Sequence, residues 1–160
     1  MCFKNLMKSF ILVVFATLML SACATKKVST PGQMQGDVYT GTDTVEYLAK
    51  GVPDRVFYAT NESILTTRSR DTLRKQAAWL RTNSDVTITL EGHCDERGTR
   101  EYNLALGERR ANAAKDYLMT YGISGNRISV ISYGKERHGN SGSNPLAWSQ
   151  NRRAVTVKVN

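Results

Sequence analysis

The chain has 160 residues and a formal net charge of +8, with 22 Lys and Arg against 14 Asp and Glu. That length suits one domain of ordinary size and excludes an enzyme with separate cofactor and substrate lobes. Hydrophobic residues at 41% exclude a multi-pass membrane protein, and three cysteines cannot form a disulfide framework without leaving one unpaired.

The amino-terminal segment has the parts of a secretory signal. Lys4 and Lys8 precede an apolar run over residues 10–20 that contains no acid. This run spans about 16 Å as a helix, roughly half of the ~30 Å hydrocarbon core, so we do not expect a membrane-spanning helix. A basic patch before a short apolar core is typical of export signals, and residues 1–22 are therefore predicted to be a signal peptide.

The apolar run closes on Leu20-Ser21-Ala22-Cys23, which resembles a bacterial lipobox. The resemblance implies that the Cys23 thiol is acylated and that Cys23 becomes the first residue of the mature chain. The alternative is a buried cysteine at the end of a core helix. Ala24 rather than Asp follows, which by analogy with enteric lipoproteins favours the outer membrane. Several acyl chains anchor a protein durably, so we expect a lipid-anchored protein facing the periplasm.

Processing of this kind changes the charge and the thiols of the chain. Removal of Lys4 and Lys8 leaves 20 Lys and Arg against 14 acids, a net charge of +6 (20 − 14). With Cys2 removed and Cys23 acylated, Cys94 is the only free thiol, so we expect no intramolecular disulfide.

The next segment has the composition of a linker. Residues 24–43 are rich in Thr, Gly, Lys, Ser and Gln and show no apolar periodicity. We predict that residues 23–43 are the lipidated cysteine and a flexible tether, with a root-mean-square span of about 25 Å. Residues 44–160 are then the folded domain.

From residue 44 onward, apolar residues recur with strand and helix periods in turn. The predicted elements are a short helix at 45–50, a strand at 55–58, a helix at 66–82, a strand at 86–90, a helix at 101–121, and strands at 128–133 and 154–159. The order β-α-β-α-β-β predicts an α/β (α+β) fold with a mixed four-stranded sheet and helices packed on one face.

The connection over residues 91–101, between a predicted strand and helix, is dense in ionisable groups. Loops at the carboxyl ends of strands are where ligands bind in α/β proteins. In the helix that follows, Arg110 falls on the apolar stripe, between Leu106 and Ala114. A buried guanidinium needs an anion, because an uncompensated charge would cost several kcal/mol. Asp95 is the natural candidate in this connection.

Two interpretations of Arg110 remain open on the residues alone. One is an internal ion pair with Asp95 that holds the loop on the helix. The other is a zwitterion clamp, in which Arg110 binds a carboxylate and Asp95 an ammonium, so that the two recognise an amino-acid-like end. Asn103, Leu106 and Arg110 recur at helical spacing and face one way.

The stretch from Asp95 to Ala111 matches the pattern D-x-x-G-x4-N-x2-L-x3-R-A. On this pattern the chain is similar to the OmpA-like C-terminal domain family, which binds peptidoglycan. The strings GHCDERGTREYNLALGERRANA, ISYGKE and SQNRRAV resemble the peptidoglycan-associated lipoproteins (Pal) of the Tol–Pal system. The resemblance covers about residues 54–159 and agrees with the lipobox.

The resemblance implies non-covalent binding of the peptidoglycan stem peptide at its meso-diaminopimelate, with no cofactor. It implies that Asp95 holds the amine and Arg110 the carboxylate of that residue. The other positions that it implies for the binding site are Asn103, Leu106, Thr60 and Asn61. Ala59 departs from the family, in which an aspartate is frequent at this place.

The same resemblance implies a tether between outer membrane and cell wall that serves envelope integrity and cell division. The implied partners are the periplasmic Tol propeller protein, competing with peptidoglycan for one surface, and the periplasmic part of the Tol inner-membrane protein. A general wall-anchoring lipoprotein without a Tol partner is the alternative.

Three other function classes fit the sequence less well. A metal-dependent cell-wall hydrolase could use His93, Cys94, Asp95, Glu96 and His138, but adjacent residues cannot all converge on one ion, and no i, i+4 His pair or C-x2-C spacing exists. No G-x-S-x-G motif indicates nucleophilic catalysis. Nucleic-acid binding is not expected, because acids are interspersed with the basic residues. We therefore expect neither an enzyme nor a metal site.

Three further arginines have weaker assignments. Arg109 points about 100° away from Arg110 on a helix, which favours a surface or phosphate-facing charge. Arg152 and Arg153 open the last predicted strand and point to opposite faces, so at most one can face the loop around Asp95.

Overall fold

The computed structural model describes residues 34–159, and the predicted signal peptide and Cys23 lie outside this range. The strands are β1 (Met34–Gln35), β2 (Val38–Tyr39), β3 (Tyr47–Ala49), β4 (Val52–Pro53), β5 (Arg55–Phe57), β6 (Thr87–His93), β7 (Ile128–Gly134) and β8 (Arg153–Val159). The helices are α2 (Thr67–Thr82), α3 (Arg100–Thr120), α4 (Pro145–Asn151) and a 3₁₀ turn (Gly125–Arg127). No helix within residues 34–159 is both long and apolar enough to cross a membrane.

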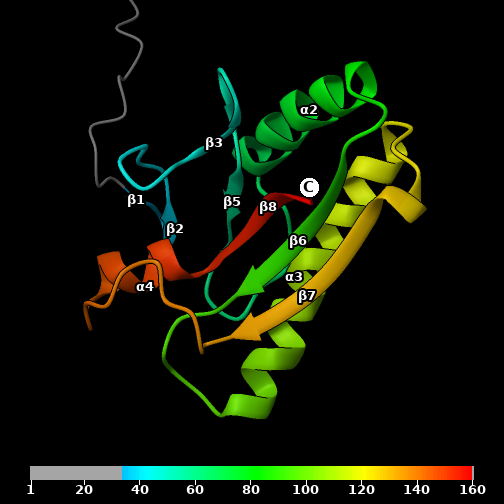
Figure 1. The fold of residues 1–160 in the computed structure, drawn as a ribbon. Coiled ribbons are helices and arrows are strands. Elements are labelled where there is room, and N and C mark those ends of the chain that lie inside the picture. Colours follow the sequence, from blue (N-terminus) through cyan, green and yellow to red (C-terminus); the bar gives the residue numbers. More distant parts are fainter. Residues whose placement is uncertain (1–33, 160) are drawn as a thin grey trace, which may run out of the picture.

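The main sheet has four strands in the order β5-β8-β6-β7. β6 and β7 are parallel, whereas β8 runs antiparallel to both of its neighbours. Helices α2 and α3 lie on one face of this sheet, and α4 lies at its end beside the β1–β2 hairpin (Figure 1). The predicted mixed four-stranded sheet with helices on one face is therefore confirmed.

The core lies between the sheet and these two helices. Ile88 and Leu90 of β6 point toward the helices, while Thr87 and Thr89 alternate to the other face. The helices contribute Leu73, Ala77, Leu80, Ala111, Ala114 and Leu118. The helices predicted at 66–82 and 101–121 agree with the observed α2 and α3 to within one residue at every end. The agreement is close because residues that recur at helical spacing over many turns define a helix well.

A close approach between two glycines fixes α3 against the end of β6. A Cβ atom added to Gly92 of β6 would lie 1.8 Å from the carbonyl oxygen of Gly107 in α3. Only residues without side chains permit this contact. It places the first turns of α3 directly beside the residues that follow β6.

Two expectations for the amino-terminal part are wrong. The predicted short helix at 45–50 is instead a hairpin of β3 and β4, which turns at Gly51 with φ of +76°. The predicted tether is too long, because β1 and β2 pair within it and Tyr39 is fully buried with its ring 4.8 Å from that of Phe57. The folded part therefore includes residues 34–43.

Helix α4 does not appear among the predicted elements. Asn144 caps it by accepting a hydrogen bond from the backbone N–H of Ala147, and Pro145 stands at its first turn. The helix spans only seven residues, too few for an apolar period to show in the sequence. It brings Trp148 and Arg152 to the end of the sheet at which β6 terminates.

Candidate binding site around Asp95

The residues singled out in the sequence gather at one end of the sheet. The carboxyl ends of β5 and β6, the start of β8, α4 and the β1–β2 hairpin all meet there (Figure 1). Asp95 lies in the connection between β6 and α3, two residues after His93. Thr60 and Asn61 lie in the connection between β5 and α2.

Asp95 is held by two arginines and its side chain is only 8% exposed. Arg97 donates from Nε to Oδ1 at 3.1 Å and from Nη2 to Oδ2 at 2.7 Å, and its backbone N–H also donates to Oδ1. Arg152 donates from Nη1 to Oδ2 at 3.2 Å. Burial raises the pKa of Asp95, but the bonds from Arg97 and Arg152 outweigh it, so the pKa lies below its ordinary value. Asp95 is therefore a carboxylate.

Arg110 does not pair with Asp95, so the first of the two interpretations, an internal Arg110–Asp95 ion pair, is wrong. Its guanidinium is fully buried and donates to three backbone carbonyls: Nε to Glu62 at 2.8 Å, Nη1 to His93 at 2.9 Å and Nη2 to Ala59 at 2.9 Å. The guanidinium thus joins the connection after β5 to the end of β6. Burial lowers the pKa of Arg110. Neutral carbonyl oxygens take the place of the anion that we expected.

Arg97 is the most accessible arginine of the site. Its side chain is 42% exposed, whereas that of Arg152 is 3% exposed. The guanidinium lies over the ring of Trp148 at 4.4 Å, and Nη2 also reaches Thr60 Oγ1 at 3.4 Å. The hydrogen bonds from Arg97 to Asp95 raise the pKa of the Arg97 guanidinium. Arg97 therefore covers Asp95 from the solvent side.

The β1–β2 hairpin adds a second carboxylate. Asp37 Oδ2 accepts a hydrogen bond from the backbone N–H of Thr60 at 2.6 Å, and the Asp37 carbonyl accepts one from Arg152. Arg152 also donates from Nε to the carbonyl of Tyr58 at 3.1 Å. The hairpin thus closes one side of the site, which the prediction of a tether over these residues did not foresee.

Asn103 and Leu106 are both buried on α3, and Asn103 bonds to the connection that precedes the helix. Asn103 Nδ2 donates to the carbonyls of Arg97 at 2.7 Å and Thr99 at 3.0 Å, which fixes the connection before α3. Leu106 lies one turn further along α3 and is buried as well. Asn61 is exposed and has φ of 57°, a left-handed conformation that asparagine tolerates better than most residues.

His93 and Cys94 are buried. Cys94 Sγ contacts the carbonyl of Asn103 at 3.3 Å, and burial raises the pKa of the thiol. Burial and the charge of Arg153 lower the pKa of His93 to about 3. Among residues 34–159, no three His, Cys, Asp or Glu side chains are arranged to hold a metal ion.

Four residues of the site were not among the predicted binding residues: Asp37, Arg97, Trp148 and Arg152. Arg97 carries a sequence signal, because it lies inside the charged connection. The statement that at most one of Arg152 and Arg153 faces this loop is confirmed. Arg152 reaches Asp95, while Arg153 donates to the carbonyl of Arg137 on the other side.

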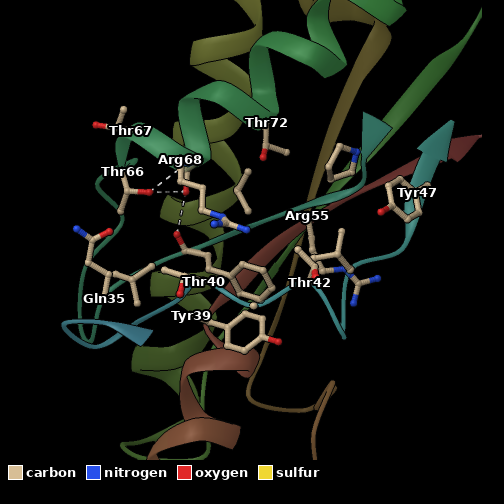
Figure 2. Close-up of a pocket in the computed structure, with 17 residues that line it drawn as sticks. Gln35, Tyr39, Thr40, Thr42, Tyr47, Arg55, Thr66, Thr67, Arg68 and Thr72 are labelled. Atoms are coloured by element: carbon tan, nitrogen blue, oxygen red, sulfur yellow. Dashed lines mark hydrogen bonds between the residues drawn. The ribbon is translucent and has the colours of Figure 1, made fainter. Parts of the chain in front are cut away.

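A separate hollow of about 450 Å³ lies between the two amino-terminal hairpins and the start of α2 (Figure 2). Arg68 and Thr72 of α2 line one wall, and Tyr39 lies on the opposite wall. Neither Asp95 nor Arg110 lines it. The candidate site is the charged cluster rather than this hollow, because the cluster brings together opposite charges from separate parts of the chain.

The fold and the connection around Asp95 define an OmpA-type domain: the OmpA family model matches residues 57–152. A peptidoglycan-associated lipoprotein of Brucella melitensis is 43% identical over 151 residues, which cover 91% of this chain and 89% of the relative. The crystal structure of the peptidoglycan-associated lipoprotein from Burkholderia pseudomallei superposes with a TM-score of 0.65 at 33% identity, covering 66% of this chain and 90% of the other. The chain belongs to the OmpA family and, within it, to the peptidoglycan-associated lipoproteins.

A more distant likeness shows how widely the fold occurs. The C-terminal domain of Helicobacter pylori MotB has a TM-score of 0.62 but only 17% identity, over 67% of this chain and 84% of the MotB domain.

The OmpA family match begins at Phe57, so the two amino-terminal hairpins lie outside it. Asp37 is therefore a contribution to the site from outside the matched domain.

Proposed function

We propose that the protein binds the stem peptide of peptidoglycan at the site around Asp95 and so ties a lipid anchor to the cell wall. The observation that carries the proposal is a nearly buried carboxylate, Asp95, whose outer partner is the exposed guanidinium of Arg97. A buried carboxylate behind an exposed cation is suited to exchanging that cation for a ligand ammonium. The names of the relatives support peptidoglycan as the source of the ligand.

The proposed site residues have different roles. Asp95 accepts the ammonium group of diaminopimelate, and Thr60 and Asn61 form the wall on the side of the connection after β5. Asn103 and Leu106 keep the connection before α3 in place. None of these roles requires bond breaking, so the proposed activity is binding without catalysis.

Arg110 contributes to binding from below the surface. Because its side chain has no exposed area, it acts by holding the carbonyls of Ala59, Glu62 and His93 in position. Direct contact with a ligand carboxylate, which the family resemblance implies, requires the connection over residues 59–62 to open.

Co-sedimentation with insoluble peptidoglycan tests the binding proposal. The purified protein should sediment with the polymer, and Asp95→Asn should remove this binding because a neutral amide no longer attracts an ammonium. Asp116→Asn, at an exposed position of α3, is the matched control and should bind as the wild type does. Sedimentation of Asp95→Asn at the wild-type level would refute the site.

The anchor and the partners complete the proposal. We propose that residues 1–22 are removed, that Cys23 carries the lipid, and that the protein resides in the outer membrane, facing the periplasm. Labelling with palmitate, lost in Cys23→Ala, tests the anchor. We also propose the periplasmic Tol propeller protein and the Tol inner-membrane protein as partners. If the propeller protein is a partner, the purified lipoprotein should retain it, and added peptidoglycan should reduce this retention. No retention would favour the alternative of a general wall-anchoring lipoprotein without a Tol partner.

A further inference from the structure

We propose that the hollow between the amino-terminal hairpins and α2 is a second binding site, which takes an N-acetylated sugar of the glycan strand that carries the stem peptide. This inference rests on the proposed function, because a stem peptide bound at Asp95 is attached to such a strand. The hollow has a volume of about 450 Å³, within the roughly 300–1,000 Å³ that is usual for sites of small ligands. It therefore has room for a sugar ring with its substituents.

The charges around the hollow disfavour a cationic ligand. Among the described residues that line it there is no Asp or Glu, whereas Arg55 and Arg68 do line it. The Arg55 guanidinium is already paired with Asp54 and Glu46. The exposed guanidinium of Arg68, on the wall formed by α2, is placed to donate to the carbonyl oxygen of an N-acetyl group (Figure 2). The hollow therefore takes a different chemistry from the site around Asp95.

The lining combines apolar surface with hydroxyl groups, as a sugar ring does. Val38 and Phe57 are among the residues that supply the apolar surface, on which the C–H face of a sugar packs. The hydroxyls come from five threonines that line the hollow: Thr40, Thr42, Thr66, Thr67 and Thr72. Threonine and sugar hydroxyls both donate and accept hydrogen bonds, so the two sets are complementary. An acyl chain would instead cover hydroxyls without offering them a hydrogen bond, which is unfavourable.

Two tyrosines add an aromatic face and an unused hydroxyl. Tyr47 is 61% exposed and lies on the side of the hollow opposite Gln35 (Figure 2). Tyr39 is fully buried, and its hydroxyl has no hydrogen-bond partner within the described part of the chain. This hydroxyl lies beside Gly41, which also lines the hollow, since a Cβ atom on Gly41 would collide with it. A sugar hydroxyl or N-acetyl group that enters beside Gly41 would supply the missing partner.

The β1–β2 hairpin joins the hollow to the site around Asp95. Asp37, at the turn of this hairpin, accepts a hydrogen bond from the backbone N–H of Thr60, and Tyr39, two residues further on, lines the hollow. Two residues of a strand span about 7 Å. Two amino acids and a lactyl group separate diaminopimelate from the sugar, roughly 10 Å of extended chain. One strand therefore reaches both places, and binding at the first raises the effective concentration at the second.

Calorimetric titration with two soluble ligands tests the inference: a stem peptide containing meso-diaminopimelate, and the same peptide attached to its N-acetylated disaccharide. The purified wild-type protein should bind the second ligand about fivefold or more tightly, as for one or two added hydrogen bonds. In Tyr47→Ala and in Thr72→Val this ratio should fall to about twofold or less, because each removes one contact of the sugar while the affinity for the peptide alone stays the same. Tyr102→Ala, at an exposed tyrosine of α3 outside the hollow, is the matched control and should keep the wild-type ratio.

The outcomes separate this inference from the proposed function. Equal wild-type affinity for the two ligands would overturn the sugar site and leave the proposed function standing, whereas binding of neither would refute both. NMR of isotope-labelled protein locates the sugar: the peptide-free disaccharide should shift the backbone amide signals of Gly41 and Thr72. Shifts confined to the surroundings of Asp95 would overturn the inference. Shifts at the hollow with lauric acid but not with the disaccharide would assign it to an apolar chain instead.

Discussion

Replacement of Arg110 by methionine should destabilise the fold. The change keeps most of the side-chain volume but removes the donors that bind the carbonyls of Ala59, Glu62 and His93. Leaving the buried His93 carbonyl without a donor should cost about 1–3 kcal/mol of folding stability. The carbonyls of Ala59 and Glu62 are partly buried, so water can reach them and each lost bond should cost about 1 kcal/mol. Burial of the Arg110 charge is itself unfavourable, as the lowered pKa of Arg110 indicates, so removing this charge offsets part of the loss. We expect a net destabilisation of about 3 kcal/mol.

Urea denaturation followed by circular dichroism measures this loss directly. A change of about 3 kcal/mol is a large part of the ~5–15 kcal/mol that stabilises a typical domain, and should lower Tm by about 10 °C. Arg109→Met is the matched control, because Arg109 is exposed and directly precedes Arg110 on the same helix. It should change the free energy of unfolding by less than about 0.5 kcal/mol. Equal stability of Arg110→Met and wild type would show that the three carbonyl bonds contribute nothing net.

Three further predictions concern other buried groups. Because the pKa of His93 is about 3 in the folded protein and about 6.5 when unfolded, stability should fall as pH drops from about 6.5 toward 3, by about 3 kcal/mol at pH 4.5; urea titrations of His93→Gln should lack this part of the slope. The Cys94 thiol, buried and with a raised pKa, should resist a thiol reagent until urea unfolds the chain; fast labelling of native protein would contradict its burial. Gly92→Ala should destabilise by about 3 kcal/mol or more, since its Cβ would collide with the Gly107 backbone; a wild-type Tm would show that α3 can shift freely.

The parts of the fold that could be predicted from sequence are those with long apolar periods. Helix α2 has an apolar stripe along its 16 residues, α3 has buried residues at helical spacing along its 21, and β6 alternates up to Gly92, so these elements can be recognised. The hairpins over residues 34–53 have strands of two or three residues in a Thr- and Gly-rich segment, which has the composition of a linker. A tertiary contact, the burial of Tyr39 against Phe57, holds the first hairpin to the sheet, and such a contact leaves no local pattern.

The same distinction applies to the site. An arginine on an apolar stripe predicts a buried partner for Arg110, and its guanidinium does donate to three buried or partly buried acceptors, although none is the anion that we expected. Its acceptors are backbone carbonyls, which every residue has, so side-chain identities could not reveal them. The partners that Asp95 has instead, Arg97 and Arg152, lie two and 57 residues away in the chain. Only the fold brings the second of these to the site.

The fluorescence of Trp148 tests the central claim, that peptidoglycan binds at Asp95, most directly. Trp148 lies against Arg97, which covers Asp95, and Trp79→Phe leaves Trp148 as the only tryptophan of the chain. Titration of Trp79→Phe with a soluble stem peptide containing meso-diaminopimelate should change the fluorescence in a saturable way, and Asp95→Asn in the same background should abolish the change. Saturable binding of equal strength in both proteins would contradict the account.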